Sequence, residues 1–199
     1  LHPEAVAGLV PVSMGHPRRL RDAIVGDTAQ LRASGYVLGF QRPWVPERQL
    51  VADDARRIGE FLTEWSGTPD WPSPEVSEMF RRAFQHTNTA HCALEYHRWA
   101  MRSIPRRDGR RFVHEVSVNS VNAPVLQVHG ALDRTVLPRT ATGSREFTAG
   151  PFAWRLMDEV GHFPHEEAPE KFNELLTGWL ADGRGWLDPP ETSPFDLHA

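Results

Sequence analysis

Two apolar runs in the second half of the chain have the pattern of buried β-strands. Residues 124–130 read Pro-Val-Leu-Gln-Val-His-Gly, and residues 153–157 read Ala-Trp-Arg-Leu-Met. After the second run, large apolar residues recur at the spacing of an amphipathic helix. These residues are Phe172, Leu175, Leu176, Trp179 and Leu180. The succession of strand, strand and helix predicts an α/β fold for this part of the chain.

The middle of the chain has the pattern of helices joined by turns that contain proline and glycine. Apolar spacing predicts one helix from about residue 46 to residue 65 and another from about residue 90 to residue 101. Ser73 before Pro74 is typical of an N-cap followed by proline at the first helical position, which predicts a further helix between these two. The arginine-rich residues 106–111 are interpreted as a polar linker that leads back to the α/β part.

An acidic residue and a histidine follow the two predicted strands. Asp133 comes shortly after residues 124–130, and His162 comes shortly after residues 153–157. The carboxyl ends of neighbouring parallel strands lie at one edge of a sheet, so we expect the two side chains to meet there. A carboxylate in contact with an imidazole fixes its tautomer and stabilises its protonated form. Either residue alone is typical of a loop, but together they predict a catalytic pair.

This order resembles the second half of the α/β-hydrolase family, whose members carry nucleophile, acid and histidine in that sequence. Asp133 in His-Gly-Ala-Leu-Asp-Arg matches the family's acid, and His162 in Val-Gly-His-Phe-Pro-His matches its histidine. The resemblance implies the C-terminal portion of an α/β-hydrolase fold, with a mostly parallel sheet and an inserted helical cap. The parts it implies are the end of the first half of the hydrolase core (1–17), the cap (18–116), the second half of the core (117–182) and an irregular tail (183–199).

The family's nucleophile elbow and oxyanion loop are not found in this sequence. The nearest candidate nucleophile is Ser13, but Pro11 stands where the tight turn of the elbow needs a small residue. Residues 5–13 resemble instead the strand that follows the helix of the elbow. We therefore expect the chain to be part of a longer protein. Alone it is expected to be inactive, because it lacks the nucleophile. It is also expected to be poorly soluble, because half a sheet leaves an apolar edge exposed.

Two tyrosines in the predicted cap narrow the resemblance to the epoxide hydrolases. The residues from Tyr36 to Pro43 are similar to the family's first lid motif, Tyr-x-x-x-Phe-Gln-x-Pro, and those around Tyr96 resemble the segment of the second lid tyrosine. In that family, two phenols hold the epoxide oxygen and stabilise the alkoxide as the ring opens. The chemistry favours such donors, since an alkoxide is a poor leaving group and a phenol stays protonated at neutral pH.

The resemblance also implies a mechanism. An aspartate nucleophile, absent from this chain, would attack an epoxide carbon to form an alkyl ester. His162, oriented by Asp133, would then activate the water that hydrolyses the ester and releases a vicinal diol. No metal and no organic cofactor is needed, and the aromatic residues of the cap suggest a small apolar substrate.

Three other functions are also compatible with these residues. Haloalkane dehalogenases share the aspartate and the histidine, and the cap tryptophans would have to bind the halide. Serine esterases share the acid and the histidine but have no need of Tyr36 and Tyr96. A catalytically silent binding module of the same fold would have no reason to keep both Asp133 and His162.

Composition and charge exclude several classes of function. The net charge is −4 with 24% charged residues, and no basic stripe indicates nucleic-acid binding. Apolar runs fall short of the length needed to span a bilayer. Cys92 is the single cysteine, which favours a reducing compartment, and we expect a cytoplasmic protein. The sequence leaves open the oligomeric state, the stereochemistry of the reaction and the presence of a signal peptide.

Overall fold

The computed structural model describes residues 5–182. Its centre is a two-stranded parallel sheet of β1 (Val125–Gly130) and β2 (Phe152–Met157). Val125 pairs with Phe152 and Gly130 with Met157, so both strands run in register to the same edge. The two predicted strands are therefore confirmed. The predicted irregular tail, residues 183–199, lies outside the described residues.

The first described residues extend this sheet by one further segment. Leu9 and Val12 form isolated parallel bridges with Val125 and Val128 of β1. The N–H of Leu126 donates to the carbonyl of Leu9 at 3.0 Å. Residues 9–12 thus lie beside β1 as the strand-like segment that the sequence predicted, although the pairing consists of separate bridges.

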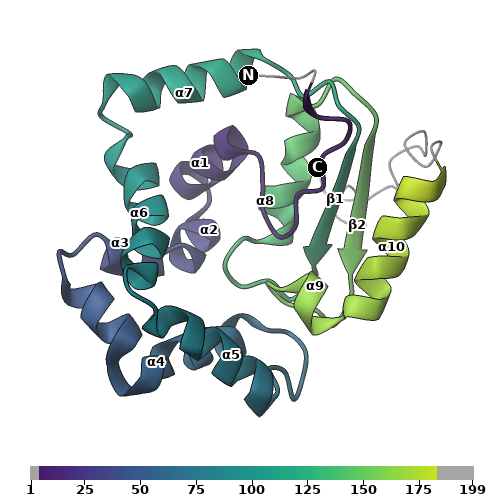
Figure 1. Cartoon of the computed structure of the whole chain (residues 1–199). Coiled ribbons are helices and arrows are strands. Elements are labelled where there is room, and N and C mark those ends of the chain that lie inside the picture. The colour runs from purple at the N-terminus through teal and green to yellow at the C-terminus, as the bar shows by residue number, and fades with distance from the viewer. Residues whose placement is uncertain (1–4, 183–199) are drawn as a thin grey trace.

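The closing helix α10 (Pro169–Asp182) packs on the sheet. Figure 1 shows α10 on one side of the sheet and α1 to α7 gathered on the other. Phe172 and Trp179 of α10 are buried with Leu126, Val128 and Ala153 in one apolar cluster. Leu180 was predicted on the same face but is 59% exposed, since the contact face of the helix is narrower than the apolar stripe.

Seven helices precede β1 within the described residues. They are α1 (Pro17–Gly26), α2 (Thr28–Ala33), α3 (Tyr36–Phe40), α4 (Val45–Trp65), α5 (Pro74–Gln85), α6 (Thr89–Arg102) and α7 (Arg107–Val118). The predicted N-cap is confirmed, because the hydroxyl of Ser73 accepts a hydrogen bond from the N–H of Val76 at 3.3 Å. Three short elements follow strands: α8 (Pro138–Thr142), the 3-10 helix η2 (Gly143–Phe147) and α9 (Pro164–Glu167).

The helical region has an apolar cluster of its own. Leu50, Ile58 and Leu94 are buried between α4 and α6, and phenylalanines from α3, α4 and α5 pack around them. Helix α4 is kinked at Asp53, Asp54 and Ala55, which have left-handed φ values of 50°, 53° and 55°. A separate apolar centre is what an inserted cap would have, and the division into core and cap stays a prediction.

The interpretation of residues 106–111 as a linker was wrong, because most of them form the first turns of α7. Their charges are spaced for a helix surface. Arg111 donates to Glu115, one turn further on, at 2.7 Å. Such pairs stabilise an exposed helix face, so a run of charges does not by itself indicate a linker.

No helix among residues 5–182 has the length and apolar character required to cross a membrane.

Candidate active site

Asp133 and His162 meet at the carboxyl ends of the two strands. Figure 1 shows the tips of β1 and β2 side by side, next to α9. Oδ2 of Asp133 lies 2.8 Å from Nδ1 of His162. Asp133 is 3% exposed, whereas the His162 ring is partly open to solvent. The sequence predicted both residues and their meeting point from the order of the strands.

The other oxygen of Asp133 is held by the turn that follows it. Oδ1 accepts hydrogen bonds from the N–H of Thr135 at 2.8 Å, from its hydroxyl at 2.9 Å and from the N–H of Val136 at 3.1 Å. The hydroxyl of Thr135 also lies 2.8 Å from Nδ1 of His162. An aspartate that accepts main-chain N–H groups two and three residues ahead is a common turn, but such a turn does not by itself indicate that Thr135 contacts His162.

A second, fully buried histidine contacts the same carboxylate. Nε2 of His129 lies 2.8 Å from the carbonyl of Val136 and 3.3 Å from Oδ2 of Asp133. Its ring stacks on Trp154 with centroids 5.6 Å apart. Burial raises the pKa of Asp133, but the hydrogen bonds from His129 and His162 outweigh it and hold that pKa well below its usual range. Asp133 is therefore ionised and able to stabilise a protonated His162.

The loop that carries His162 is fixed to the end of α4. The N–H of His162 donates to the carbonyl of Trp65 at 2.9 Å. A Cβ on Gly161 would stand 2.3 Å from the nitrogen of Gly67 and 2.4 Å from the carbonyl oxygen of Trp65. Only glycine allows so close an approach of the two backbones. The position of His162 thus depends on a segment of the helical region.

The buried carboxylate of Glu167 joins the same two segments. Its oxygens accept hydrogen bonds from the N–H groups of Gly67, Thr68, Gly161 and Phe163 at 2.8–3.1 Å, and from the hydroxyls of Ser66 and Thr68 at 2.9 and 3.0 Å. Burial raises the pKa of Glu167, but these donors outweigh it, so its pKa lies below the usual value. The sequence did not indicate this connection, because Ser66, Gly67 and Thr68 lie about a hundred residues before Glu167 in the chain.

Aromatic rings connect His162 to the first predicted lid tyrosine. The Trp65 ring contacts His162 at a centroid distance of 5.8 Å and Tyr36 at 4.9 Å. Burial, the charge of Asp133 and Tyr96 raise the pKa of Tyr36 to about 12. The hydroxyl of Tyr36 therefore stays protonated and is available as a donor near the Asp133–His162 pair.

The second predicted lid tyrosine lies differently. Tyr96, on α6, is 67% exposed. Its ring contacts His97 at a centroid distance of 5.6 Å, and the His97 ring in turn contacts Tyr36 at 5.9 Å. Tyr36 thus contacts Trp65, which contacts His162, whereas Tyr96 lies further from His162 and is exposed.

Ser13 has no hydrogen bond to His162 within the described part of the chain. Its side chain is buried, its hydroxyl has no hydrogen-bond partner there, and its N–H donates to the carbonyl of Val128 at 3.0 Å. The residue has a φ of 49° and ends the segment that pairs with β1.

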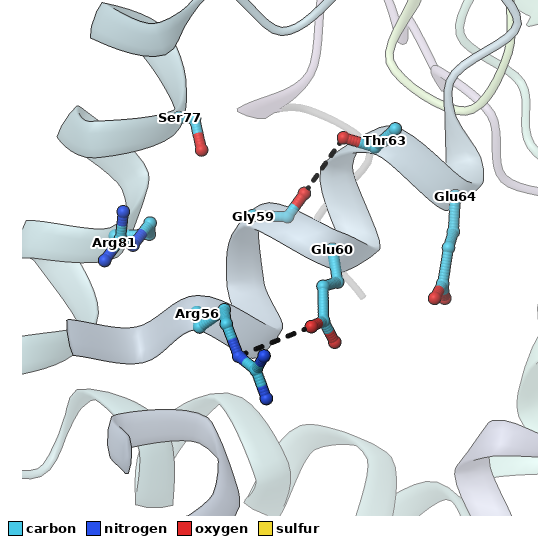
Figure 2. Close-up of a pocket in the computed structure, with 7 residues that line it drawn as sticks. All are labelled: Arg56, Gly59, Glu60, Thr63, Glu64, Ser77 and Arg81. Carbon is cyan, nitrogen blue, oxygen red and sulfur yellow. Dashed lines mark hydrogen bonds and ion pairs between the residues drawn. The ribbon is translucent and has the colours of Figure 1, made fainter. Parts of the chain in front are cut away.

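Two cavities of the helical region lie apart from these residues. One, of about 430 Å³, lies between α4 and α5 and is lined by charged and small polar side chains such as Arg56, Glu60 and Arg81 (Figure 2). The other, of about 460 Å³, borders α4 on the side of Phe40 and Leu50. Neither is lined by Asp133, His162 or the tyrosines. Among residues 5–182, no cluster of three or more histidine, cysteine or acidic side chains is arranged to hold a metal ion.

Comparison with known proteins places this geometry in context. No family model matches the chain. It is 22% identical over 185 residues to epoxide hydrolase 3 of Xenopus tropicalis and 20% identical over 185 residues to epoxide hydrolase 4 of Homo sapiens. Both matches cover 91% of this chain and 48% of the relative. The chain thus spans about half the length of the curated relatives it matches.

Solved structures show the same architecture. An inhibitor complex of an epoxide hydrolase from Bacillus megaterium matches with a TM-score of 0.73 at 21% identity, over 90% of this chain and 62% of that one. Cfl2 from Burkholderia cenocepacia matches with a TM-score of 0.73 at 18% identity, over 89% and 58%. Identities this low show the fold and leave the substrate open. The chain therefore has part of an α/β-hydrolase fold, and its predicted resemblance to the epoxide hydrolases is confirmed.

Proposed function

We propose that the protein to which this chain belongs hydrolyses a small apolar epoxide to a vicinal diol through an aspartyl ester. The observation that carries the proposal is the hydrogen bond of 2.8 Å between the buried, ionised Asp133 and the partly exposed His162. The ring of Trp65 contacts both His162 and Tyr36, so Tyr36 lies on the far side of Trp65 from His162. This arrangement supplies a base for water and a donor for the epoxide oxygen on the same side of the helical region.

The first step needs an acid and a nucleophile. A carboxylate, which we place outside this chain, forms a bond to one epoxide carbon while the bond from that carbon to oxygen breaks. The electron pair of the broken bond goes to the oxygen, which takes the proton of the Tyr36 hydroxyl. Donors aimed at the site where charge develops supply the largest share of stabilisation in such steps.

The second step needs a base. Nε2 of His162 takes a proton from water, and the resulting hydroxide adds to the carbonyl of the ester. The bond between the carbonyl carbon and the alkoxide oxygen then breaks, and the alkoxide takes the proton of the new carboxylic acid, so the diol leaves and the carboxylate is restored. The proton on His162 returns through solvent to Tyr36. Asp133 accepts a hydrogen bond from Nδ1 of His162 and stabilises the imidazolium from the time His162 takes the proton until it returns it.

Aromatic side chains favour an apolar substrate. Trp65 and Phe163 both touch the His162 ring, with centroids 5.8 and 5.1 Å away. Trp71 packs against Phe163 at 5.3 Å. These rings offer apolar contact area next to the base, and they limit the access of bulk water to the ester.

The rival functions make different demands on the same residues. A dehalogenase binds halide through N–H groups, and a serine esterase has no use for a phenol beside Trp65. The position of Tyr36 favours the epoxide over both. A silent binding module has no use for a buried carboxylate, which is costly to desolvate and which here is fully bonded to the histidine and its turn.

The test is single-turnover hydrolysis of styrene oxide in ¹⁸O-labelled water by the protein from the longest reading frame that contains this chain. We expect ¹⁸O in a carboxylate of the protein and unlabelled diol after the first turnover. Label in the diol alone would contradict the ester. Release of chloride from 1-chlorobutane, or hydrolysis of p-nitrophenyl acetate, with no diol from styrene oxide would move the function to a dehalogenase or an esterase.

A further inference from the structure

One face of α6 carries the residues that point into the helical region. Leu94 and Arg98 are 1% and 3% exposed and stand one turn apart. His97 lies beside Arg98 and one turn after Leu94, so it belongs to the same face. Tyr96 is two residues from both Leu94 and Arg98, which places it on the opposite side of the helix. Tyr96 therefore faces away from the buried side chains of Leu94 and Arg98.

Arg98 fixes the rotation of α6. Its Nε donates to the carbonyl of Phe40 at 2.8 Å, and its Nη2 donates to the carbonyl of Arg42 at 2.8 Å and to Glu47 at 3.0 Å. These bonds join α6 to the end of α3 and the start of α4. Turning Tyr96 inward would break the buried ion pair with Glu47, which is strongly unfavourable.

The ring of His97 lies beside the ring of Tyr36. Its ring contacts Tyr36 at a centroid distance of 5.9 Å, nearly perpendicular, and Phe40 at 5.3 Å. Tyr36 in turn contacts Trp65, and Trp65 contacts His162. A continuous series of rings therefore runs from His97 to the proposed base.

The chemistry of His97 suits hydrogen-bond donation. Burial lowers the pKa of the His97 imidazole, which is therefore neutral at neutral pH and carries one N–H. A neutral N–H in a poorly hydrated site is an effective donor to a developing alkoxide. Tyr96 also contributes to the raised pKa of Tyr36.

We infer that His97, rather than Tyr96, is the second hydrogen-bond donor to the epoxide oxygen, paired with Tyr36. The inference rests on the proposed function and makes the ring-opening site a tyrosine–histidine pair. His97 donates its N–H hydrogen bond while the carbon–oxygen bond of the epoxide breaks, and the proton itself comes from Tyr36.

The test compares four variants by rapid-quench measurement of ester formation from styrene oxide in the full-length protein. His97→Phe keeps a ring but has no N–H, and its ester formation is expected to slow about 100-fold while ester hydrolysis keeps its rate. His97→Tyr restores a donor and should recover most of the loss. His114→Phe makes the same change at an exposed side chain on α7, and serves as the matched control. Tyr96→Phe should slow ester formation less than His97→Phe does.

Ester formation by His97→Phe at the unchanged rate, or a larger loss from Tyr96→Phe, overturns the role of His97 and leaves the proposed function standing. Absence of ester from the unchanged protein overturns both. A second measurement needs no variant: saturation with the diol product, 1-phenylethane-1,2-diol, should shift the ring ¹⁵N resonances of His97. Unshifted resonances in the presence of bound diol contradict the assignment.

Discussion

The Asp133–His162 pair and the polar side chains of α3 and α6 are positioned by different means. The pair stands on loops at the ends of two parallel strands, and its place follows from strand order and from main-chain hydrogen bonds. Tyr36, Tyr96 and His97 stand on helices, where a rotation decides which residue faces the site. A motif in a loop at a strand end therefore identifies the functional residue itself. A motif on a helix identifies the helix but not which of its residues faces the site.

The largest expected effect is on the strand-end pair. Asp133→Asn places an amide against Nδ1 of His162 and favours the wrong tautomer, so turnover of styrene oxide should fall by about 10⁴-fold. Steady-state diol formation by the full-length protein measures it. An effect below about tenfold would mean that the carboxylate is structural, because loss of a tautomer-fixing acid costs far more.

Removing the helix-borne donor should have a smaller effect. Tyr36→Phe is expected to slow ester formation by about 10²-fold, the usual consequence of losing one such donor. Because the pKa of Tyr36 is raised to about 12, its hydroxyl stays protonated through the alkaline range. Ester formation should therefore show no Tyr36-dependent fall near pH 10, the ordinary value for a phenol. A fall there that disappears in Tyr36→Phe contradicts this environment.

Much of the strand-end site could be predicted from the sequence, and the helix-borne site only in part. The apolar runs predicted β1 and β2, and the positions of Asp133 and His162 just after these runs predicted the catalytic pair. Tyr96 matched a motif, but the choice between it and His97 depends on the buried face of α6. Ala90, Leu94 and Arg98 are the buried residues of that face, and the burial of Arg98 could not be foreseen, because arginines are normally exposed.

The anchors of the site were also beyond the reach of local patterns. Glu167 bonds to Ser66, Gly67 and Thr68, which lie about a hundred residues away in the chain. Gly161 is needed because two backbones approach there, and a sequence does not reveal which backbones meet. Topology and local turns were predictable, whereas contacts between the helical region and the strand-end loops required the structure.

Glu167 connects the two regions, and its loss should appear as a change in stability. Glu167→Gln leaves N–H groups with a weaker acceptor, and we expect a loss of about 2–3 kcal/mol in the free energy of unfolding, measured with urea at pH 7. Glu166→Gln, at the neighbouring and more exposed side chain, is the matched control and should change little.

The contribution of Glu167 to stability should also depend on pH. The pKa of Glu167 is depressed in the folded state, so its contribution is present above the unfolded value of about 4.3 and is lost as the pH falls through the folded value. Glu167→Gln should therefore lose less stability than the unchanged protein over this acidic window. Parallel curves for the two proteins would contradict the role of this carboxylate.

The smallest effect is expected from the turn after Asp133. Thr135→Val removes one hydroxyl that bonds to Oδ1 of Asp133, while the main-chain donors remain. Turnover should fall by about fivefold, which corresponds to one hydrogen bond of about 1 kcal/mol. A loss as large as that of Asp133→Asn would show that Thr135 carries the orientation of His162 by itself.

The central claim is that His162, held by Asp133, activates water against an ester. The most direct measurement is mass spectrometry of the full-length His162→Gln variant after exposure to styrene oxide. We predict that one substrate mass is added per protein molecule, that it persists, and that no further diol forms. Steady production of diol by this variant, with no added mass, would contradict the account.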